Sequence, residues 1–238
     1  MTAGSRAAAS AALRISNLRA GYGKARVLHG LDLAVEPGEM VGVAGPNGVG
    51  KSTLLKAISG LMPRMADRME FGGAPLKQSP VDAVVQGIAH VPEGRRVLAD
   101  LTVEENLRIG GIGGRVQDFA SVRQGVVDRF PSIVPLLHRK AGLLSGGQQQ
   151  LVAIARGLVA QPRLLMVDEL SLGLSPTAVA SISAATVSSC RELGASLLWV
   201  DQNLAILGKH CDRVILLRDG VAVDIDPRDT GATNSAYF

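Results

Sequence analysis

The chain has 238 residues, of which 47% are hydrophobic and 19% charged, and its formal net charge is +4. This length and apolar content suit one sizeable core, with room for an inserted subdomain. No apolar run approaches the roughly 18 residues that a membrane-spanning helix needs. Aromatic residues make up only 3% of the chain, too few for the stacking platforms of proteins that bind single-stranded nucleic acid. Two cysteines without metal-binding or redox spacing suit a reducing compartment. Because no apolar run is long enough to span a membrane, we expect a protein that is soluble or held at a membrane by a partner.

Residues 1–12 are rich in alanine and serine, with Arg6 as their one charged side chain. This composition is faintly that of a transit peptide. Alanine is too weakly apolar for a signal core, however, and no clear cleavage site follows. We therefore expect a flexible N-terminal extension over residues 1–12 and one domain over residues 13–238.

Short strands and turns are predicted over residues 13–35, because apolar and polar residues alternate at residues 31–35. Tyr22 stands between two glycines in this segment. Such neighbours would let the ring stand exposed, where a purine could stack on it. The other reading is a tyrosine of the core, and position alone leaves both open.

A nine-residue stretch matches the phosphate-binding P-loop pattern G-x-x-x-x-G-K-[ST] without a mismatch: Gly45-Pro46-Asn47-Gly48-Val49-Gly50-Lys51-Ser52-Thr53. An apolar run at residues 40–44 precedes it, as expected of a buried parallel strand. Four apolar residues follow at the spacing of a packed helix face, namely Leu54, Leu55, Ile58 and Leu61. Gly60 would end that helix. Glycines let backbone N–H groups surround phosphate oxygens, and the helix directs its positive end at the same charge. Lys51 would reach the β- and γ-phosphates, and the Ser52 hydroxyl would bind Mg²⁺.

Residues 61–100 are mixed, with a predicted strand at residues 88–91 that leads into a polar loop containing Glu93. The carboxyl end of such a strand is where α/β sheets place ligand chemistry. Helical spacing dominates residues 102–140, and the glycine-rich stretch at residues 110–114 predicts a break between two or more helices. We expect these helices to form a small inserted subdomain at about residues 98–160.

The segment Leu144-Ser145-Gly146-Gly147-Gln148, here called the signature segment, has the pattern of a capping box, with serine followed three residues later by glutamine. It predicts a helix that runs to a stop before Pro162. A helix amino terminus with two glycines is a second potential anion site. Taken alone, the segment is equally well read as nothing more than a well-capped helix.

A second apolar run, residues 164–167, ends in two acids, Asp168 and Glu169. In P-loop enzymes the first acid of such a strand holds Mg²⁺, and an adjacent carboxylate can polarise the attacking water. Ser175 and the proline after it predict the start of a further helix. Another buried strand is expected at residues 195–200, ending at Asp201 and Gln202, and residues 219–220 have the sequence of a two-residue hairpin turn.

These motifs together resemble the nucleotide-binding subunits of ATP-binding cassette (ABC) transporters, over residues 13–226. The P-loop alone indicates only an NTPase, whereas the signature segment upstream of the acid-ended strand is specific to the ABC group. The resemblance implies an α/β fold, a P-loop core with an antiparallel β-subdomain and an inserted helical subdomain. It also implies that two such domains pair head to tail, so that each ATP lies between the P-loop of one and the signature segment of the other.

The resemblance assigns roles to the matching positions. Tyr22 would stack on adenine, the P-loop would hold the phosphates, and Ser52 with Asp168 would bind Mg²⁺. Glu169 would be the general base. The signature residues would bind the partner's ATP, with Ser145 and Gly147 at its γ-phosphate beside Gly146 and Gln148.

Some positions depart from the family pattern. Glu93 stands where a glutamine is usual, and Gln202 replaces the usual histidine; both remain candidates for catalytic roles. Leu170 takes the place of a proline, and the loop at residues 171–174 lacks the usual aspartate. Three features together are similar to one of the two ATPase subunits of bacterial importers for branched-chain amino acids and related amides or urea. They are Val91-Pro92-Glu93-Gly94-Arg95-Arg96, Ser171-Leu172-Gly173-Leu174-Ser175-Pro176 and a Gln-Asn pair after the last core strand.

The resemblance therefore implies an ATPase that uses ATP and Mg²⁺ to power solute import. Its implied partners are a second ABC ATPase subunit, identical or not, transmembrane permease subunits and, indirectly, a solute-binding protein; nucleic acid is not among them. It would lie on the cytoplasmic face of the inner membrane. One alternative is a non-transport ABC ATPase acting on nucleic acid or the ribosome, although such proteins usually carry tandem cassettes, coiled-coil insertions or zinc modules. Another is an orphan regulatory ATPase without a permease.

Overall fold

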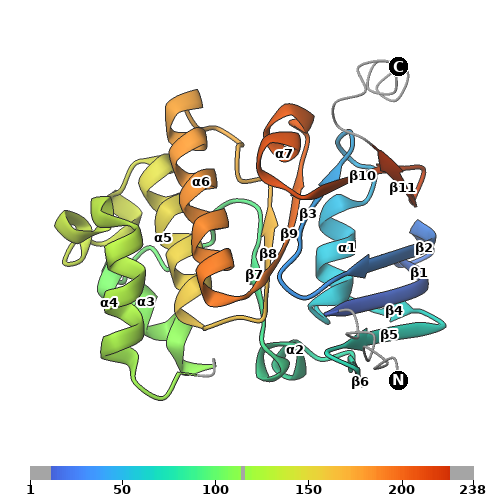
Figure 1. The fold of residues 1–238 in the computed structure, drawn as a ribbon, viewed down its shortest axis with the longest axis horizontal. Helices are drawn as coiled ribbons and strands as arrows, with labels where there is room; N and C mark the ends of the chain where they lie inside the picture. Colours follow the sequence, from blue (N-terminus) through green and yellow to red (C-terminus); the bar gives the residue numbers. More distant parts are fainter. Residues whose placement is uncertain (1–11, 114–115, 226–238) are drawn as a thin grey trace, which may run out of the picture.

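Two β-sheets and a set of helices make up the part of the chain that this computed structural model describes, residues 12–113 and 116–225. Most of the expected N-terminal extension lies outside these residues. In Figure 1 the central sheet stands between a group of helices on the left and the second sheet on the right. The predicted α/β class, with an antiparallel β-subdomain and an inserted helical subdomain, is confirmed.

The central sheet has six strands in the order β11-β10-β3-β9-β8-β7, and all neighbours are parallel except β11. Its strands are β3 (Met40–Ala44), β7 (Ile88–Val91), β8 (Leu164–Asp168), β9 (Ser196–Asp201), β10 (Arg213–Arg218) and β11 (Val221–Ile225). Strands β3, β8 and β9 are buried along their whole length, as continuous apolar runs predict for a parallel sheet covered on both faces. The predicted hairpin joins β10 to β11, and both of its turn residues have positive φ, 49° at Asp219 and 71° at Gly220.

The second sheet is antiparallel and consists of β1 (Leu13–Tyr22), β2 (Ala25–Val35), β4 (Arg64–Met65), β5 (Arg68–Phe71) and β6 (Ala74–Pro75). The alternation noted at residues 31–35 corresponds to the buried face of β2, where Leu31, Leu33 and Val35 all lie inside. The short strands β4 to β6 were not predicted. They are two to four residues long, too short for a period of two to be recognised in the sequence.

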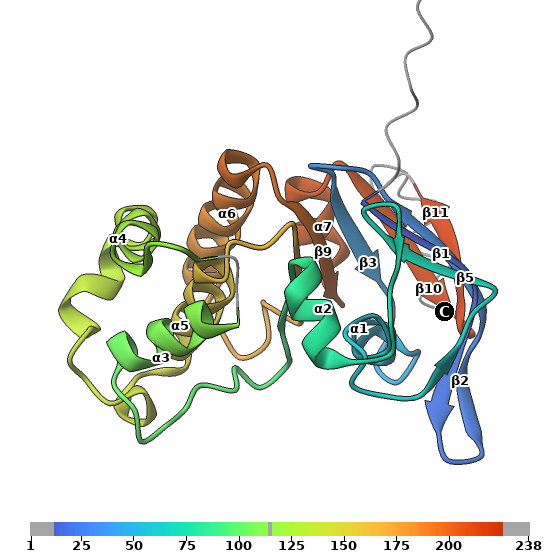
Figure 2. The same ribbon diagram turned by 90° about the horizontal axis from the view of Figure 1, so that it is seen from below.

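Helix α1 (Lys51–Ile58) lies between the two sheets (Figures 1 and 2). Its residues Leu54, Leu55 and Ile58 are buried in one core with side chains from β1, β2 and one face of the central sheet. Leu61 was expected on this packed face, and that expectation was wrong, because its side chain is 58% exposed. Helix α1 ends at Ile58, and Gly60, with φ of 72°, turns the chain before Leu61.

The other face of the central sheet is covered by α5 (Gly146–Val159), α6 (Pro176–Leu193) and α7 (Leu204–His210), and a second core fills this interface. Helices α3 (Val103–Ile112) and α4 (Phe119–Arg129) pack on α5 further from the sheet (Figure 2). Two 3₁₀ segments, Pro131–Leu136 and Ala141–Leu143, lead into α5. No helix among the described residues is long and apolar enough to cross a membrane.

The expected break at residues 110–114 begins later than predicted, because α3 continues through Gly110 and Gly111 to Ile112. A side chain at Gly110 would collide with the backbone carbonyl of Arg156 on α5. Gly110 therefore permits close contact between two helices, a long-range reason that local sequence does not reveal. Helix α2 (Pro80–Gln86) was also missed, although Ser79 caps it and Pro80 occupies its first position, a recognisable start signal.

Asn106 holds the entry to the helical subdomain in place. It is fully buried on α3, and its Oδ1 accepts a hydrogen bond from the Leu98 N–H at 2.9 Å. Its Nδ2 donates to the carbonyls of Leu98, at 3.1 Å, and Thr102, at 2.9 Å. One buried side chain thus supplies hydrogen-bond partners to the backbone of the segment that precedes α3.

We predict that Asn106→Ala lowers the free energy of unfolding by about 2–3 kcal/mol, because it removes a fully buried side chain and its hydrogen bonds to the backbone before α3. The measurement is urea denaturation of the full-length chain. Gln124→Ala, at an exposed position of α4, is the control and should change stability by less than about 0.5 kcal/mol. Equal stabilities for the two variants would contradict the role given to Asn106.

Candidate active site

The carboxyl ends of β3, β9, β8 and β7 meet at one edge of the central sheet, because these strands are parallel neighbours. The P-loop follows β3, Gln202 follows β9, Glu169 follows β8 and Glu93 follows β7. A pocket of about 380 Å³ lies at this edge. Its lining residues are Tyr22, Val27, Asn47, Gly48, Gly50, Lys51, Ser52, Thr53, Glu93, Glu169 and Leu172. The structure thus brings together most residues that the sequence singled out for ATP.

The path of the P-loop depends on two glycines for different reasons. Gly50 precedes α1 with φ of 112°, a left-handed conformation that side-chain-bearing residues rarely adopt. Gly45 has no such φ, but a Cβ there would lie 2.6 Å from the Leu217 carbonyl oxygen on β10. The loop therefore opens toward the pocket while its start rests against the neighbouring strand.

Lys51 is the cation of this pocket, and its side chain is buried. Its Nζ donates hydrogen bonds to the carbonyl oxygens of Gly45, at 2.8 Å, and Pro46, at 3.0 Å. The same Nζ lies 3.5 Å from Glu169 Oε1. The ammonium group is therefore fixed between the P-loop and the carboxylate at the end of β8, where it would attract an anion.

Ser52 and Asp168 form the predicted Mg²⁺ pair, and Ser52 Oγ donates to Asp168 Oδ1 at 3.1 Å. The pKa of Asp168 is raised to about 6, mainly by burial; the Ser52 hydrogen bond opposes this shift, and the nearby charges of Glu169 and Glu93 add to it. A divalent cation would favour the ionised carboxylate. Hydroxyl and carboxylate oxygens suit Mg²⁺, which keeps water and phosphate as its other ligands. No group of three or more His, Cys, Asp or Glu side chains in the described ranges could hold a metal. The Ser52 hydroxyl and the Asp168 carboxylate are the residues that would hold Mg²⁺ together with a bound nucleotide.

Glu169 and Gln202 meet in the pocket region, as their assignment as catalytic candidates requires. Gln202 Nε2 donates to Glu169 Oε1 at 3.3 Å. The Glu169 backbone has φ of 49°, a strained conformation for a residue with a side chain, and its N–H donates to the Val200 carbonyl at 2.9 Å. Glu93 lines the same pocket with an exposed side chain.

Tyr22 is exposed, so it is not a tyrosine of the core. It ends β1 with 54% of its surface accessible. Lys56 Nζ donates to the Tyr22 hydroxyl at 3.2 Å and lies 5.8 Å from the ring centroid. The ring therefore stands at the mouth of the P-loop pocket, and its contact with adenine stays a prediction.

The signature segment forms the amino terminus of α5, with both hydrogen bonds of the predicted capping box. Gln148 Oε1 accepts from the Ser145 N–H at 3.0 Å, and the Gln148 N–H donates to Ser145 Oγ at 3.4 Å. Gly146 lies under the Arg95 guanidinium, since a Cβ there would be 2.6 Å from Arg95 Nη2. Ser145, Gly147 and Gln148 line a separate hollow of about 470 Å³ with residues of α6 and the end of α4. Within one chain, therefore, the signature segment and the P-loop line different pockets.

Sequence reasoning missed a buried polar network beside the site. The Asp201 carboxylate, at the end of β9, accepts hydrogen bonds from Ser171 Oγ at 2.7 Å and from the Ser171 N–H at 3.2 Å. The same carboxylate also accepts hydrogen bonds from the Trp199 indole N–H, at 3.3 Å, and from the Asn203 backbone N–H, at 3.0 Å. The only sequence signal is position, because Asp201 directly precedes Gln202 and Ser171 lies two residues after Glu169.

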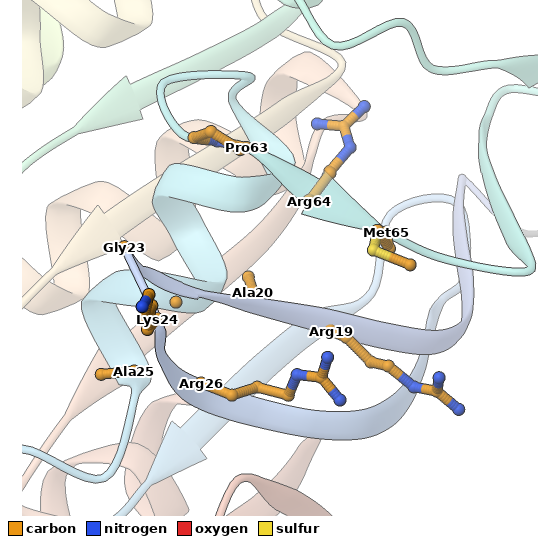
Figure 3. Close-up of a pocket in the computed structure, with 10 residues that line it drawn as sticks. Arg19, Ala20, Gly23, Lys24, Ala25, Arg26, Pro63, Arg64 and Met65 are labelled. Atoms are coloured by element: carbon orange, nitrogen blue, oxygen red, sulfur yellow. The ribbon is translucent and has the colours of Figure 1, made fainter.

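A further, basic pocket of about 220 Å³ lies between the β1–β2 hairpin and residues 63–65 (Figure 3). Arg19, Lys24, Arg26 and Arg64 are among its lining residues, and none of the described lining residues is acidic. The Arg64 side chain has a structural role, since its guanidinium donates hydrogen bonds to backbone carbonyls at the end of α1 and beside β6. This pocket shares no lining residue with the P-loop pocket and is not part of the candidate active site.

Solved structures resemble the chain over most of its length. A nucleotide-free ATP-binding cassette from an ABC transporter matches with a TM-score of 0.78 and 26% identity, covering 90% of each chain. A structure of the ADP conformation of an ATP-binding cassette of an ABC transporter matches with a TM-score of 0.79 and 25% identity, covering 94% of this chain and 97% of that one.

Curated relatives agree with the structural matches. The high-affinity branched-chain amino acid transport ATP-binding protein BraG of Pseudomonas aeruginosa is 38% identical over 89% of each chain. The probable branched-chain amino acid transport ATP-binding protein LivF of Archaeoglobus fulgidus is 34% identical, over 87% of this chain and 89% of its own. The ABC transporter family model matches residues 28–171. The chain therefore belongs to the ABC transporter family, as one of its ATP-binding ATPase proteins.

Proposed function

We propose that this chain is the ATP-hydrolysing subunit of an importer for branched-chain amino acids or related small polar solutes. The observation that carries the proposal is the meeting of Lys51, Ser52, Asp168 and Glu169 at one sheet edge. The solute class is supported by the names of two relatives, both branched-chain amino acid transport ATP-binding proteins. We take residues 13–238 as one ABC ATPase domain, with residues 98–160 as its helical subdomain.

In this proposal the P-loop amides and the Lys51 ammonium bind the ATP phosphates, while Tyr22 stacks on adenine. Ser52 and Asp168 hold Mg²⁺, which when bound neutralises charge on the phosphates. Glu169 accepts a proton from the attacking water as general base, and Gln202 and Glu93 help to orient that water. The Gln202 amide both donates and accepts hydrogen bonds but cannot become cationic as histidine can.

The proposed assembly is a head-to-tail pair of ABC ATPase subunits, either identical or different. Ser145, Gly146, Gly147 and Gln148 of one subunit bind the γ-phosphate side of ATP on the other. Support comes from the separation of the signature segment and the P-loop into different pockets, since a partner is needed to close the site. Transmembrane permease subunits anchor the pair to the cytoplasmic face of the inner membrane and receive solute from a binding protein.

We predict that Lys51→Ala abolishes hydrolysis and weakens nucleotide binding, because no other lysine or arginine lines the P-loop pocket among the described residues. The rate should fall by at least about 10²-fold, as for other groups that stabilise transferred charge. The measurement is ATP hydrolysis by the purified complex. Lys77→Ala is the control, because Lys77 is exposed and outside the pocket, and it should keep the wild-type rate. Retention of more than about a tenth of the rate by Lys51→Ala would contradict the role of Lys51.

We predict that Gln202→Ala costs less than Glu169→Gln in single-turnover hydrolysis by the assembled complex. Losing one hydrogen bond near a buried partner is worth about 1–3 kcal/mol, whereas losing a general base typically removes about 10²–10⁴ in rate. Equal inactivity of the two variants would show that the glutamine is itself an essential catalytic group. The proposal that Gln202 only orients the water would then be wrong.

We predict that co-expression with the permease genes beside its own gene brings the chain into the membrane fraction, where it resists a salt wash. Expressed alone, the chain should stay out of that fraction. Lys51→Ala is the matched control, since it removes ATP turnover without touching the helical subdomain and should still sediment with membranes. A chain that never associates with membranes, even with every neighbouring gene present, would favour an orphan ATPase instead.

A further inference from the structure

Asp201 is a charged group buried beside the site, with 1% of its surface exposed. None of the ion pairs found among the described residues includes it. A buried carboxylate without a cation depends on hydrogen bonds for its stability. Its two oxygens accept four, two on each oxygen.

Three of these four bonds come from the two loops that follow β8 and β9. The loop after β8 contributes Ser171, through both its hydroxyl and its backbone N–H. The loop after β9 contributes Asn203, through its N–H, next to Gln202. The Trp199 indole binds the same carboxylate from within β9, so its bond does not connect the loops.

The hydrogen bonds from Ser171 to Asp201 lie next to a strained part of the chain. Glu169 has a left-handed backbone and is held on one side by its N–H bond to the Val200 carbonyl. Two residues later, Ser171 is held to Asp201 at 2.7 Å. The segment carrying Glu169 is thus attached at two points to the end of β9, immediately before Gln202. Movement of Ser171 would remove two donors from a buried charge, which is costly.

We propose that Asp201 is a positioning residue that couples the loop bearing Glu169 to the loop bearing Gln202, so that both side chains face the attacking water together. The inference rests on the proposed roles of Glu169 and Gln202 and adds the group that sets their relative position. The 3.3 Å contact between Gln202 Nε2 and Glu169 Oε1 is the geometry that this coupling maintains.

The test is Ser171→Ala in the full-length chain, which removes the 2.7 Å hydroxyl bond but keeps the backbone N–H bond and so perturbs folding little. We expect the single-turnover hydrolysis rate to fall about 5- to 20-fold. This is at or below the low end of the roughly 10- to 150-fold that one hydrogen bond to a charged group is worth, because the backbone N–H bond remains. The affinity for ATP should change by less than about twofold, because Ser171 does not line the P-loop pocket.

Two further variants separate positioning from a merely structural role. If Ser171 acts through Gln202, then Ser171→Ala should lower the rate by less than about twofold when added to Gln202→Ala, since coupled groups are not additive. Trp199→Phe removes a bond to the same carboxylate that does not connect the loops. It should lower the melting temperature but leave the rate within about twofold of wild type.

The outcomes are distinct. A Ser171→Ala rate within about twofold of wild type, or effects of Ser171→Ala and Gln202→Ala that multiply in full, would overturn the coupling while leaving the ATPase intact. A rate loss in Trp199→Phe as large as in Ser171→Ala would also overturn it, because general destabilisation would then explain both. Absence of turnover by the wild-type chain would instead overturn the proposed function itself.

Discussion

Burial of charge at one edge of the central sheet is the constraint on which the rest of this structure depends. Lys51, Asp168 and Asp201 are 4%, 2% and 1% exposed, and each would be costly to bury without partners. Two loop carbonyls and Glu169 surround the lysine, a serine hydroxyl binds Asp168, and four donors serve Asp201. Parallel strand order makes this possible, because it brings loops from distant parts of the sequence to the same edge.

The elements around that edge are well packed. Helix α1 lies between two sheets, so the P-loop before it begins at a buried strand and ends at a largely buried helix. The loop after β7 is attached to α5, since Arg156 Nη2 donates to the Arg96 carbonyl at 2.8 Å and Arg95 covers Gly146. Glu93 and the signature segment therefore belong to one connected surface. These contacts join the pocket to α5 of the helical subdomain.

Much of the site could be predicted because its chemistry is local. Phosphate binding by backbone amides requires the glycines and Lys51 to lie within one short stretch, and the capping box of Ser145 and Gln148 spans only four residues. The acid-ended run at Asp168 was equally clear. What could not be predicted depends on contacts distant in sequence. The sequence alone predicts a helix break at Gly110, whereas the structure shows that this glycine permits close contact with α5. The role of Ser171 depends on its hydrogen bond to the carboxylate of Asp201, 30 residues later.

The central claim is that ATP binds at this sheet edge and that a second subunit completes the site. The most direct measurement is a structure of the full-length Glu169→Gln variant with ATP and Mg²⁺. The account predicts the γ-phosphate at Lys51, Mg²⁺ beside Ser52 and Asp168, and the partner subunit's signature segment against the same phosphate. A nucleotide bound elsewhere, or a fully enclosed ATP in a single chain, would contradict it.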